Sequence, residues 1–258
     1  MLLNCDLGES FGSWTTGQDA KAMAYIDQAN IACGFHAGDP LVMQRTLLLA
    51  KQHQVMVGAH PAYPDLVGFG RRSMNCSSQE ITAFIHYQIA ALEGMAACQG
   101  LRISYVKPHG ALYNDMMSKD TVCQAIMQAV SSYPVRAMET GAANSPLKLM
   151  LQANANADQH LKQAHDMKLE LYFEAFADRC YEDDGSLMAR SKTGAVLDHD
   201  AMLKQVQQLA QHGTVTSASG STLRLKVDSL CVHGDNDTGI AAIKSIRQLM
   251  EKPSAQKA

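Results

Sequence analysis

Apolar residues gather in short runs along the chain, and the segments between these runs carry apolar positions at helical spacing. Runs of this length and composition predict buried β-strands. We predict seven of them, over residues 2–6, 29–35, 55–60, 103–109, 135–140, 169–178 and 229–235. Strands that are apolar on both faces and alternate with helices are typical of a parallel sheet covered by helices.

Helices are predicted between these strands. Among them are residues 40–54, 78–100 and 238–252. Asp39 and Pro40 stand where an N-cap residue and a proline at the first helical position would start a helix. Ser77 is followed three residues later by Glu80, which is the pattern of a capping box. The sequence therefore marks where two of the helices begin.

The number of strand–helix units decides the domain organisation. Seven units of roughly 25–45 residues each fit one (β/α) barrel better than two small domains. We predict a single barrel domain over residues 1–252 and a flexible C-terminal tail over residues 253–258. Residues 141–168 form a polar stretch that we predict to be helical. Residues 213–227 predict a β-hairpin, because a Ser-Gly pair separates two alternating runs.

Composition and charge narrow the function classes. A formal net charge of -3 gives no electrostatic support for nucleic acid or an anionic membrane as a partner. The first residues lack a basic segment followed by a long apolar run, so no secretory signal is predicted, and no run approaches the ~20 apolar residues of a membrane span. Seven cysteines without a C-x-x-C pair indicate reduced thiols. We therefore expect a cytoplasmic protein.

Polar and titratable residues recur at the carboxyl ends of the predicted strands. The pairs are Asp6 with Glu9, His36 with Asp39, His60 with Asp65, Lys107 with His109, Glu174 with Asp178, and His233 with Asp235. In a (β/α) barrel these ends meet at one face, where active sites are built. Side chains two residues apart on a strand share a side, so Lys107 and His109 can point into the same space. The pattern predicts an active site at this face.

Several of these residues also have a structural explanation. Asp39 could serve only as a helix cap, and Asp65 could only shape the turn in "PAYPD". Arg71 and Arg72 could be solvated surface charges. A lysine at position 107 would otherwise end a buried strand without a compensating charge, which favours a functional role.

The chemistry of the predicted site is open between a His/Asp metal centre and a metal-free acid–base site. Neither an H-E-x-x-H nor a C-x-x-C spacing is present to decide between them. No G-x-x-x-x-G-K-[ST] phosphate loop is present either, so the sequence gives no nucleotide site of that type.

Six motifs resemble one protein family. They are "NCDLGESFGSW", "ANIACGFHAGDP", "GAHPAYPDLVGFGRR", "VKPHGALYN", "EAFADRCYEDDGSL" and "CVHGDN", and they follow in order from about residue 2 to residue 250. Together they are similar to the LamB/YcsF family. The resemblance implies an α/β fold, a seven-stranded variant of the (β/α) TIM barrel related to the glycoside hydrolase/deacetylase group.

The resemblance also implies an activity. It is the opening of the lactam of 5-oxo-L-proline to L-glutamate, coupled to ATP hydrolysis, as the A component of an ATP-dependent 5-oxoprolinase that works with two partner subunits, B and C. ATP would be a co-substrate of the complex, and phosphorylation of the substrate would fall to the partners. The sequence is also compatible with a homo-oligomer.

Roles for individual residues follow as hypotheses from the resemblance. Asp6 is expected to be the general base, with His60, His109 and His233 around the attacked carbon. Lys107 and Arg72 would hold anionic groups, and Arg179 would orient Asp178. The residues expected to bind substrate are Glu9, His36, Asp39, Arg72, Glu174, Asp178, Arg179 and Asp235.

Two other functions fit the same strand-end cluster. One is a metal-dependent deacetylase or amidohydrolase, in which a bound ion would lower the pKa of water to ~7. The candidate ligands for such a divalent metal are Asp6, His36, His60 and His233. The other is a non-catalytic protein that binds a metabolite for its partners. Metal analysis tests the first alternative, and catalysis by the reconstituted complex tests the second.

Overall fold

The computed structural model describes residues 1–134, 145–234 and 237–251. Its barrel strands are β1 (Leu2–Leu7), β2 (Gln28–Ala32), β3 (Met56–His60), β4 (Ile103–Val106), β5 (Lys148–Gln152), β6 (Leu171–Phe176) and β9 (Ser229–Val232). These strands close into a parallel barrel in that order, with β9 pairing with both β6 and β1. The predicted seven-stranded (β/α) barrel is confirmed.

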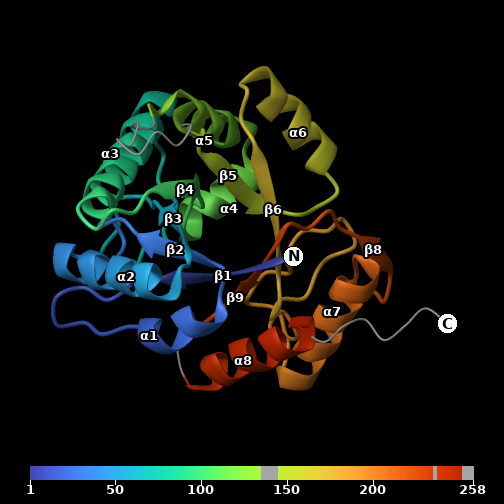
Figure 1. The fold of residues 1–258 in the computed structure, drawn as a ribbon. Helices are drawn as coiled ribbons and strands as arrows, with labels where there is room; N and C mark the ends of the chain where they lie inside the picture. Colours follow the sequence, from blue (N-terminus) through green and yellow to red (C-terminus); the bar gives the residue numbers. More distant parts are fainter. Residues whose placement is uncertain (135–144, 235–236, 252–258) are drawn as a thin grey trace.

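Helices surround the barrel (Figure 1). They are α1 (Asp19–Ala22), the 3-10 helix η1 (Met23–Tyr25), α2 (Pro40–His53), α3 (Ser78–Ala97), α4 (Gly110–Ser118), α5 (Asp120–Ser132), α6 (Ala157–Asp166), α7 (His199–His212) and α8 (Asp237–Glu251). Among neighbouring pairs, α3 packs against α5 and α7 packs against α8. None of the helices in the described ranges has the length and apolar character needed to cross a bilayer.

The predicted helix caps are confirmed. The Asp39 carboxylate accepts hydrogen bonds from the first backbone N–H groups of α2, and Pro40 is the first residue of that helix. Ser77 and Glu80 form the expected capping box at the start of α3. Such caps satisfy backbone donors that have no partner inside the helix, so local sequence fixes where these helices begin.

The fifth strand lies elsewhere than expected. Residues 135–140, where we predicted it, are outside the described residues, and the strand found in the barrel is β5. It lies within residues 141–168, which we predicted to be helical throughout, so that prediction was wrong for β5 and holds only for α6. β5 is a five-residue segment whose last four residues are buried. A strand this short leaves too few positions to separate a period of 2 from a period of 3.6.

Polar side chains fill much of the barrel interior. Tyr105 spans it, and its hydroxyl donates a hydrogen bond of 2.7 Å to Asn30 Oδ1. Asn30 Nδ2 in turn donates to Asn4 Oδ1 at 2.8 Å and to Asp6 Oδ1 at 2.7 Å. Position 58 must be glycine for this arrangement, because a Cβ there would lie 2.2 Å from the Tyr105 ring. The interior network therefore runs from β4 across β2 to the upper end of β1.

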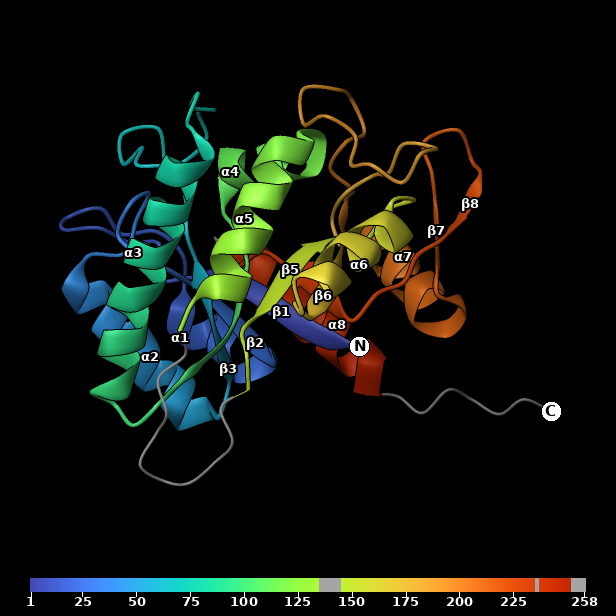
Figure 2. The same cartoon turned by 90° about the horizontal axis from the view of Figure 1, so that it is seen from above.

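A small hairpin lies outside the barrel. β7 (Thr214–Thr216) and β8 (Thr222–Arg224) pair in antiparallel fashion, which confirms the hairpin predicted within residues 213–227. Figure 2 shows it beside α7 at the edge of the molecule. It therefore contributes no strand to the barrel.

Candidate active site

One large cavity, with a volume of about 1060 Å³, lies at the carboxyl ends of the barrel strands. The predicted site residues that line it are Asp6, Glu9, His60, Lys107, His109, Asp178, Arg179 and His233. Two others, His36 and Glu174, are buried against this lining, where they contact Glu9 and Lys107 respectively. The barrel topology thus brings together most of the strand-end side chains, as expected for this fold.

Lys107 lies at the bottom of the cavity with its charge fully surrounded. It is 3% exposed. Its Nζ lies 3.0 Å from Asp6 Oδ1, 3.1 Å from Glu174 Oε2, 3.2 Å from Asn4 Oδ1 and 3.3 Å from Cys231 Sγ. Burial works against the charged form, but Asp6, Cys231 and Glu174 outweigh it and hold the pKa of Lys107 well above its usual value. The ammonium is therefore part of an internal ion-pair network.

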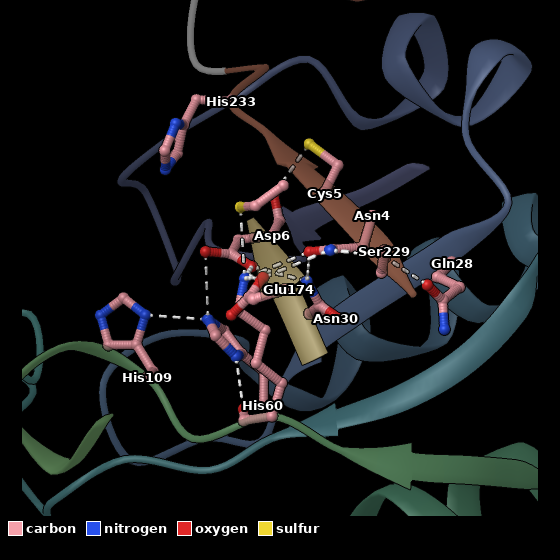
Figure 3. Close-up of polar contacts among 12 residues, drawn as sticks. Asn4, Cys5, Asp6, Gln28, Asn30, His60, His109, Glu174, Ser229 and His233 are labelled. Carbon is pink, nitrogen blue, oxygen red and sulfur yellow. Dashed lines mark hydrogen bonds and ion pairs between the residues drawn. The ribbon is translucent and has the colours of Figure 1, made fainter. Parts of the chain in front are cut away.

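Asp6 joins this network to the histidines. Its Oδ2 lies 3.4 Å from His60 Nε2, while its Oδ1 accepts hydrogen bonds from Lys107 and Asn30 (Figure 3). Burial alone would raise the pKa of Asp6, yet His60 and Lys107 lower it well below the usual value. Asp6 is therefore an ionised carboxylate at the edge of the cavity.

Two imidazoles face each other beside Asp6. His60 Nε2 and His109 Nδ1 are 3.0 Å apart (Figure 3). The other nitrogen of each ring lies at a backbone carbonyl, with His60 Nδ1 2.7 Å from Lys107 O and His109 Nε2 3.0 Å from Phe69 O. A carbonyl oxygen can only accept, so both of these outer nitrogens carry a proton. The backbone therefore fixes the orientation and tautomer of both rings.

Glu9 and His36 complete this side of the site. Glu9 Oε1 lies 3.2 Å from His36 Nε2 and 3.3 Å from His109 Nδ1. The His36 ring stacks on the His109 ring with their centroids 3.8 Å apart and an angle of 6° between the planes. Burial raises the pKa of Glu9 and lowers the pKa values of His36 and His109 well below the usual value. Desolvation thus disfavours every charged form in this group.

A second histidine site lies across the cavity. His233 Nδ1 is 3.0 Å from Asp178 Oδ2, and 26% of the His233 side chain is exposed. Burial works to lower the pKa of His233, but the hydrogen bond and the charge of Asp178 raise it above the usual value. Asp178 keeps the proton on Nδ1, which leaves Nε2 available for proton transfer. The two residues form an orienting carboxylate and a titratable imidazole.

Two predicted substrate-binding residues have local partners instead. Asp39 caps α2 and also accepts a hydrogen bond of 2.7 Å from Gly12 N. Arg72 forms an ion pair with Asp65, which also accepts from Gly68 N, and 65% of the Arg72 side chain is exposed. Neither Asp39 nor Arg72 is among the residues that line the cavity. The structure therefore supports the structural explanations of Asp39 and Asp65.

Arg179 makes its hydrogen bonds with the backbone. We predicted that it orients Asp178, but its guanidinium donates to the carbonyls of Ala195 at 3.3 Å and Met188 at 2.6 Å. These contacts hold the loop that covers the cavity, so Arg179 acts on the chain rather than as the expected clamp on its neighbour. Asp235, the last predicted substrate-binding residue, lies outside the described residues.

The cavity also contains residues outside the predicted set. They are mainly Arg71, Tyr113 and Arg190. Tyr113 is buried on α4, where burial and the carboxylate of Glu174 raise the pKa of its phenol well above the usual value. Its position four residues after His109, one helical turn away, is a signal that could have identified it. Arg190 follows an irregular loop, and no periodic pattern marks it.

Metal-ligand atoms gather in two groups within the described residues. One group consists of Glu9, His36, His60 and His109, and the other of Asp6, Cys231 and His233. The four predicted metal candidates (Asp6, His36, His60 and His233) are therefore divided between two groups and do not form one. Burial raises the pKa of Cys231 well above the usual value, so its thiol stays protonated and is a poor ligand.

A (β/α) barrel with a cavity lined by titratable side chains at its strand ends has the architecture of a barrel enzyme. Comparison with known families defines it more closely. The chain matches the LamB/YcsF family over residues 1–258 and belongs to that family. The resemblance seen in the six sequence motifs is confirmed.

Individual relatives match over nearly their whole length. A protein of Pseudomonas putida named as the second A subunit of 5-oxoprolinase is 51% identical over 253 residues, which cover 97% of this chain and 94% of the relative. The 5-oxoprolinase A subunit of Pseudomonas fluorescens is 49% identical, covering 99% of this chain and 98% of the relative. The crystal structure of a lactam utilization protein from Thermus thermophilus superposes with a TM-score of 0.85 at 34% identity, covering 97% of this chain and 96% of that one.

Proposed function

We propose that this chain is the A subunit of an ATP-dependent 5-oxoprolinase and takes part in opening 5-oxo-L-proline to L-glutamate. The observation that carries the proposal is the near full-length similarity to relatives named as 5-oxoprolinase A subunits. The two other components, B and C, and ATP as co-substrate of the complex belong to the same proposal. So does a cytoplasmic location, which the seven free cysteines favour.

The chemistry requires ATP because a five-membered lactam is resonance-stabilised and re-forms readily from glutamate. Phosphorylation of the amide oxygen makes the carbonyl carbon electrophilic. Addition of one water and cleavage of the ring C–N bond, with a proton delivered to nitrogen, then give an acyl phosphate. A second water hydrolyses the acyl phosphate to glutamate and phosphate. This sequence needs a group that takes a proton from water and a group that supplies one to the ring nitrogen.

The two sides of the cavity offer these two groups. Asp6 is held ionised by Lys107 and His60, so it can accept a proton from water, although its low pKa makes it a weak base. His233 is held in its protonated form by Asp178, so it can donate a proton to the leaving nitrogen. Asp6 and His233 offer ligand atoms within 4.8 Å of each other. A small ring between them can contact both.

Anionic groups of the substrate need cations that are not already paired. Lys107 is surrounded by its own carboxylates, whereas Arg71 and Arg190 line the cavity and are exposed. We therefore assign recognition of the substrate carboxylate or a transferred phosphate to these arginines, because guanidinium groups bind such anions in bidentate fashion. This assignment replaces the role predicted for Lys107 and Arg72.

The decisive experiment measures 5-oxoproline-dependent ATP hydrolysis and glutamate formation by this chain with the B and C subunits of a relative, such as those of Pseudomonas putida. We expect both products only when all three proteins are present, and little turnover by this chain alone. A complex containing Asp6→Asn serves as the matched control. Substantial 5-oxoproline-dependent ATP turnover by the single chain would contradict the proposed division of labour, and binding of 5-oxoproline without turnover would indicate a non-catalytic role.

A further inference from the structure

The pair formed by His60 and His109 carries an unresolved charge problem. Both outer nitrogens donate to backbone carbonyls, so the two inner nitrogens, His60 Nε2 and His109 Nδ1, each present a lone pair when the rings are neutral. These lone pairs face each other across 3.0 Å in a buried setting. Two opposed lone pairs repel, so the arrangement needs a positive centre between or beside them.

Glu9 supplies a third donor atom at the same point. Its Oε1 is 3.3 Å from His109 Nδ1, and its side chain is 11% exposed, at the cavity. Two imidazole nitrogens and one carboxylate oxygen are a donor set that zinc and related ions accept. Both histidines already have the backbone acceptor that normally orients a metal-bound imidazole. The outer contacts of a metal site are thus in place.

We propose that Glu9, His60 and His109 bind one divalent first-row transition-metal ion, such as Zn²⁺ or Mn²⁺. Ligand atoms about 2.1 Å from one ion lie roughly 3.0 Å apart at a right angle and roughly 3.4 Å apart at the tetrahedral angle. The separations of 3.0 Å between the two histidines and 3.3 Å between His109 and Glu9 fall in this range. Three protein ligands leave coordination positions open toward the cavity, as in catalytic sites.

The geometry excludes His36 as a fourth ligand, although it belongs to the same group of donor atoms. Its ring lies parallel to that of His109, with a centroid separation of 3.8 Å. The lone pairs of two stacked rings lie in parallel planes, so an ion in the plane of His109 is out of the plane of His36. His36 Nε2 instead lies 3.2 Å from Glu9 Oε1, where its N–H orients the carboxylate.

Asp6 borders the open side of this site. Its Oδ2 is 3.4 Å from His60 Nε2, and 19% of its side chain is exposed. An ion held by Glu9, His60 and His109 would lower the pKa of a bound water and attract phosphate oxygens. Asp6 is placed to accept the proton of such a water. The proposal does not depend on 5-oxoproline as the substrate, because metal binding is measured on the chain alone.

The test uses the full chain stripped with a chelator and then titrated with Zn²⁺, Mn²⁺ or Mg²⁺. Isothermal titration and elemental analysis after gel filtration give affinity and stoichiometry. We expect one Zn²⁺ or Mn²⁺ per chain and much weaker binding of Mg²⁺. His60→Ala, His109→Ala and the nearly isosteric Glu9→Gln should each weaken binding at least ~100-fold, more than the loss of an outer contact costs. Circular dichroism identifies any variant that does not fold.

Two further variants make the experiment selective. His36→Asn keeps an N–H donor beside Glu9 and should weaken binding by no more than ~10-fold. His212→Asn changes an exposed histidine at the end of α7 and should leave binding unchanged. The proposal is overturned if no ion binds below millimolar concentration, in which case the two histidines share a proton instead. It is also overturned if binding survives His60→Ala and His109→Ala, or if His36→Asn abolishes it.

Discussion

Replacing Lys107 with methionine removes the ammonium from between Asp6 and Glu174 and keeps a side chain of similar length. Glu174 is fully buried, so it would be left without its cation. Removing one partner of a buried ion pair costs about 3–5 kcal/mol. A chain of about this size changes its Tm by roughly 2–4 °C for each kcal/mol, so we expect Tm to fall by roughly 6–20 °C.

Three companion variants separate this effect from general damage. Lys107→Met combined with Glu174→Gln removes the uncompensated charge and should recover a large part of the lost stability. Lys107→Arg keeps the charge but places a planar fork where a compact ammonium fits, so it should recover less than full stability. Lys192→Met breaks an exposed ion pair with Glu182 and should change the free energy of unfolding by no more than about 1 kcal/mol.

Urea denaturation followed by circular dichroism, at constant slope, gives the free energies of unfolding. Reconstituted turnover is measured on the same preparations. If Lys107→Met unfolds within about 1 kcal/mol of wild type but loses turnover, Lys107 acts on the substrate and the ion-pair reasoning is wrong. A double variant no more stable than Lys107→Met would show that Glu174 is not the partner that matters.

Three other variants test the site more directly. Asp6→Asn should lower turnover at least ~100-fold, with a smaller loss of Tm than Lys107→Met because Glu174 still balances the ammonium; near-normal turnover would exclude Asp6 as the base. His233 is faced by Asp178, Asp6 and Lys107, and as an acid it must be protonated, so turnover should fall as pH rises through its pKa. Asp178→Asn removes the charge that raises this pKa and should move that limb of the pH–rate profile to lower pH; an unmoved limb would contradict the role of His233. Arg72→Ala should leave turnover within about twofold, because Arg72 pairs with Asp65 outside the cavity, and a large loss would restore its predicted role.

The strands that the sequence predicted well are those whose apolar runs end in a polar motif. β1, β2, β3 and β9 each finish close to a histidine or carboxylate, and this combination marks both the strand and its direction. β5 has no such motif, and its five residues resemble part of a helix when read alone. Its place in the barrel is decided by pairing with β4 and β6, which is tertiary information.

The residues at the site were predictable as a set, but their partners were not. Strand-end position was sufficient to place Asp6, His60 and His233 at one cavity, because barrel topology brings all strand ends together. It could not show that Lys107 pairs with Glu174, since this contact joins β4 to β6 through the interior. It also could not separate Asp39 and Arg72, whose side chains turn toward local backbone and turn partners.

The polar interior of the barrel explains how the site is held in position. Tyr105 donates to Asn30, and Asn30 donates to Asp6, so the carboxylate proposed as base is fixed from below by two buried side chains. Gly58 is required for the Tyr105 ring to cross the barrel, because any Cβ would overlap it. A substitution as small as Gly58→Ala would therefore act on Asp6 through this chain of contacts. The charged site thus depends on uncharged residues one and two layers beneath it.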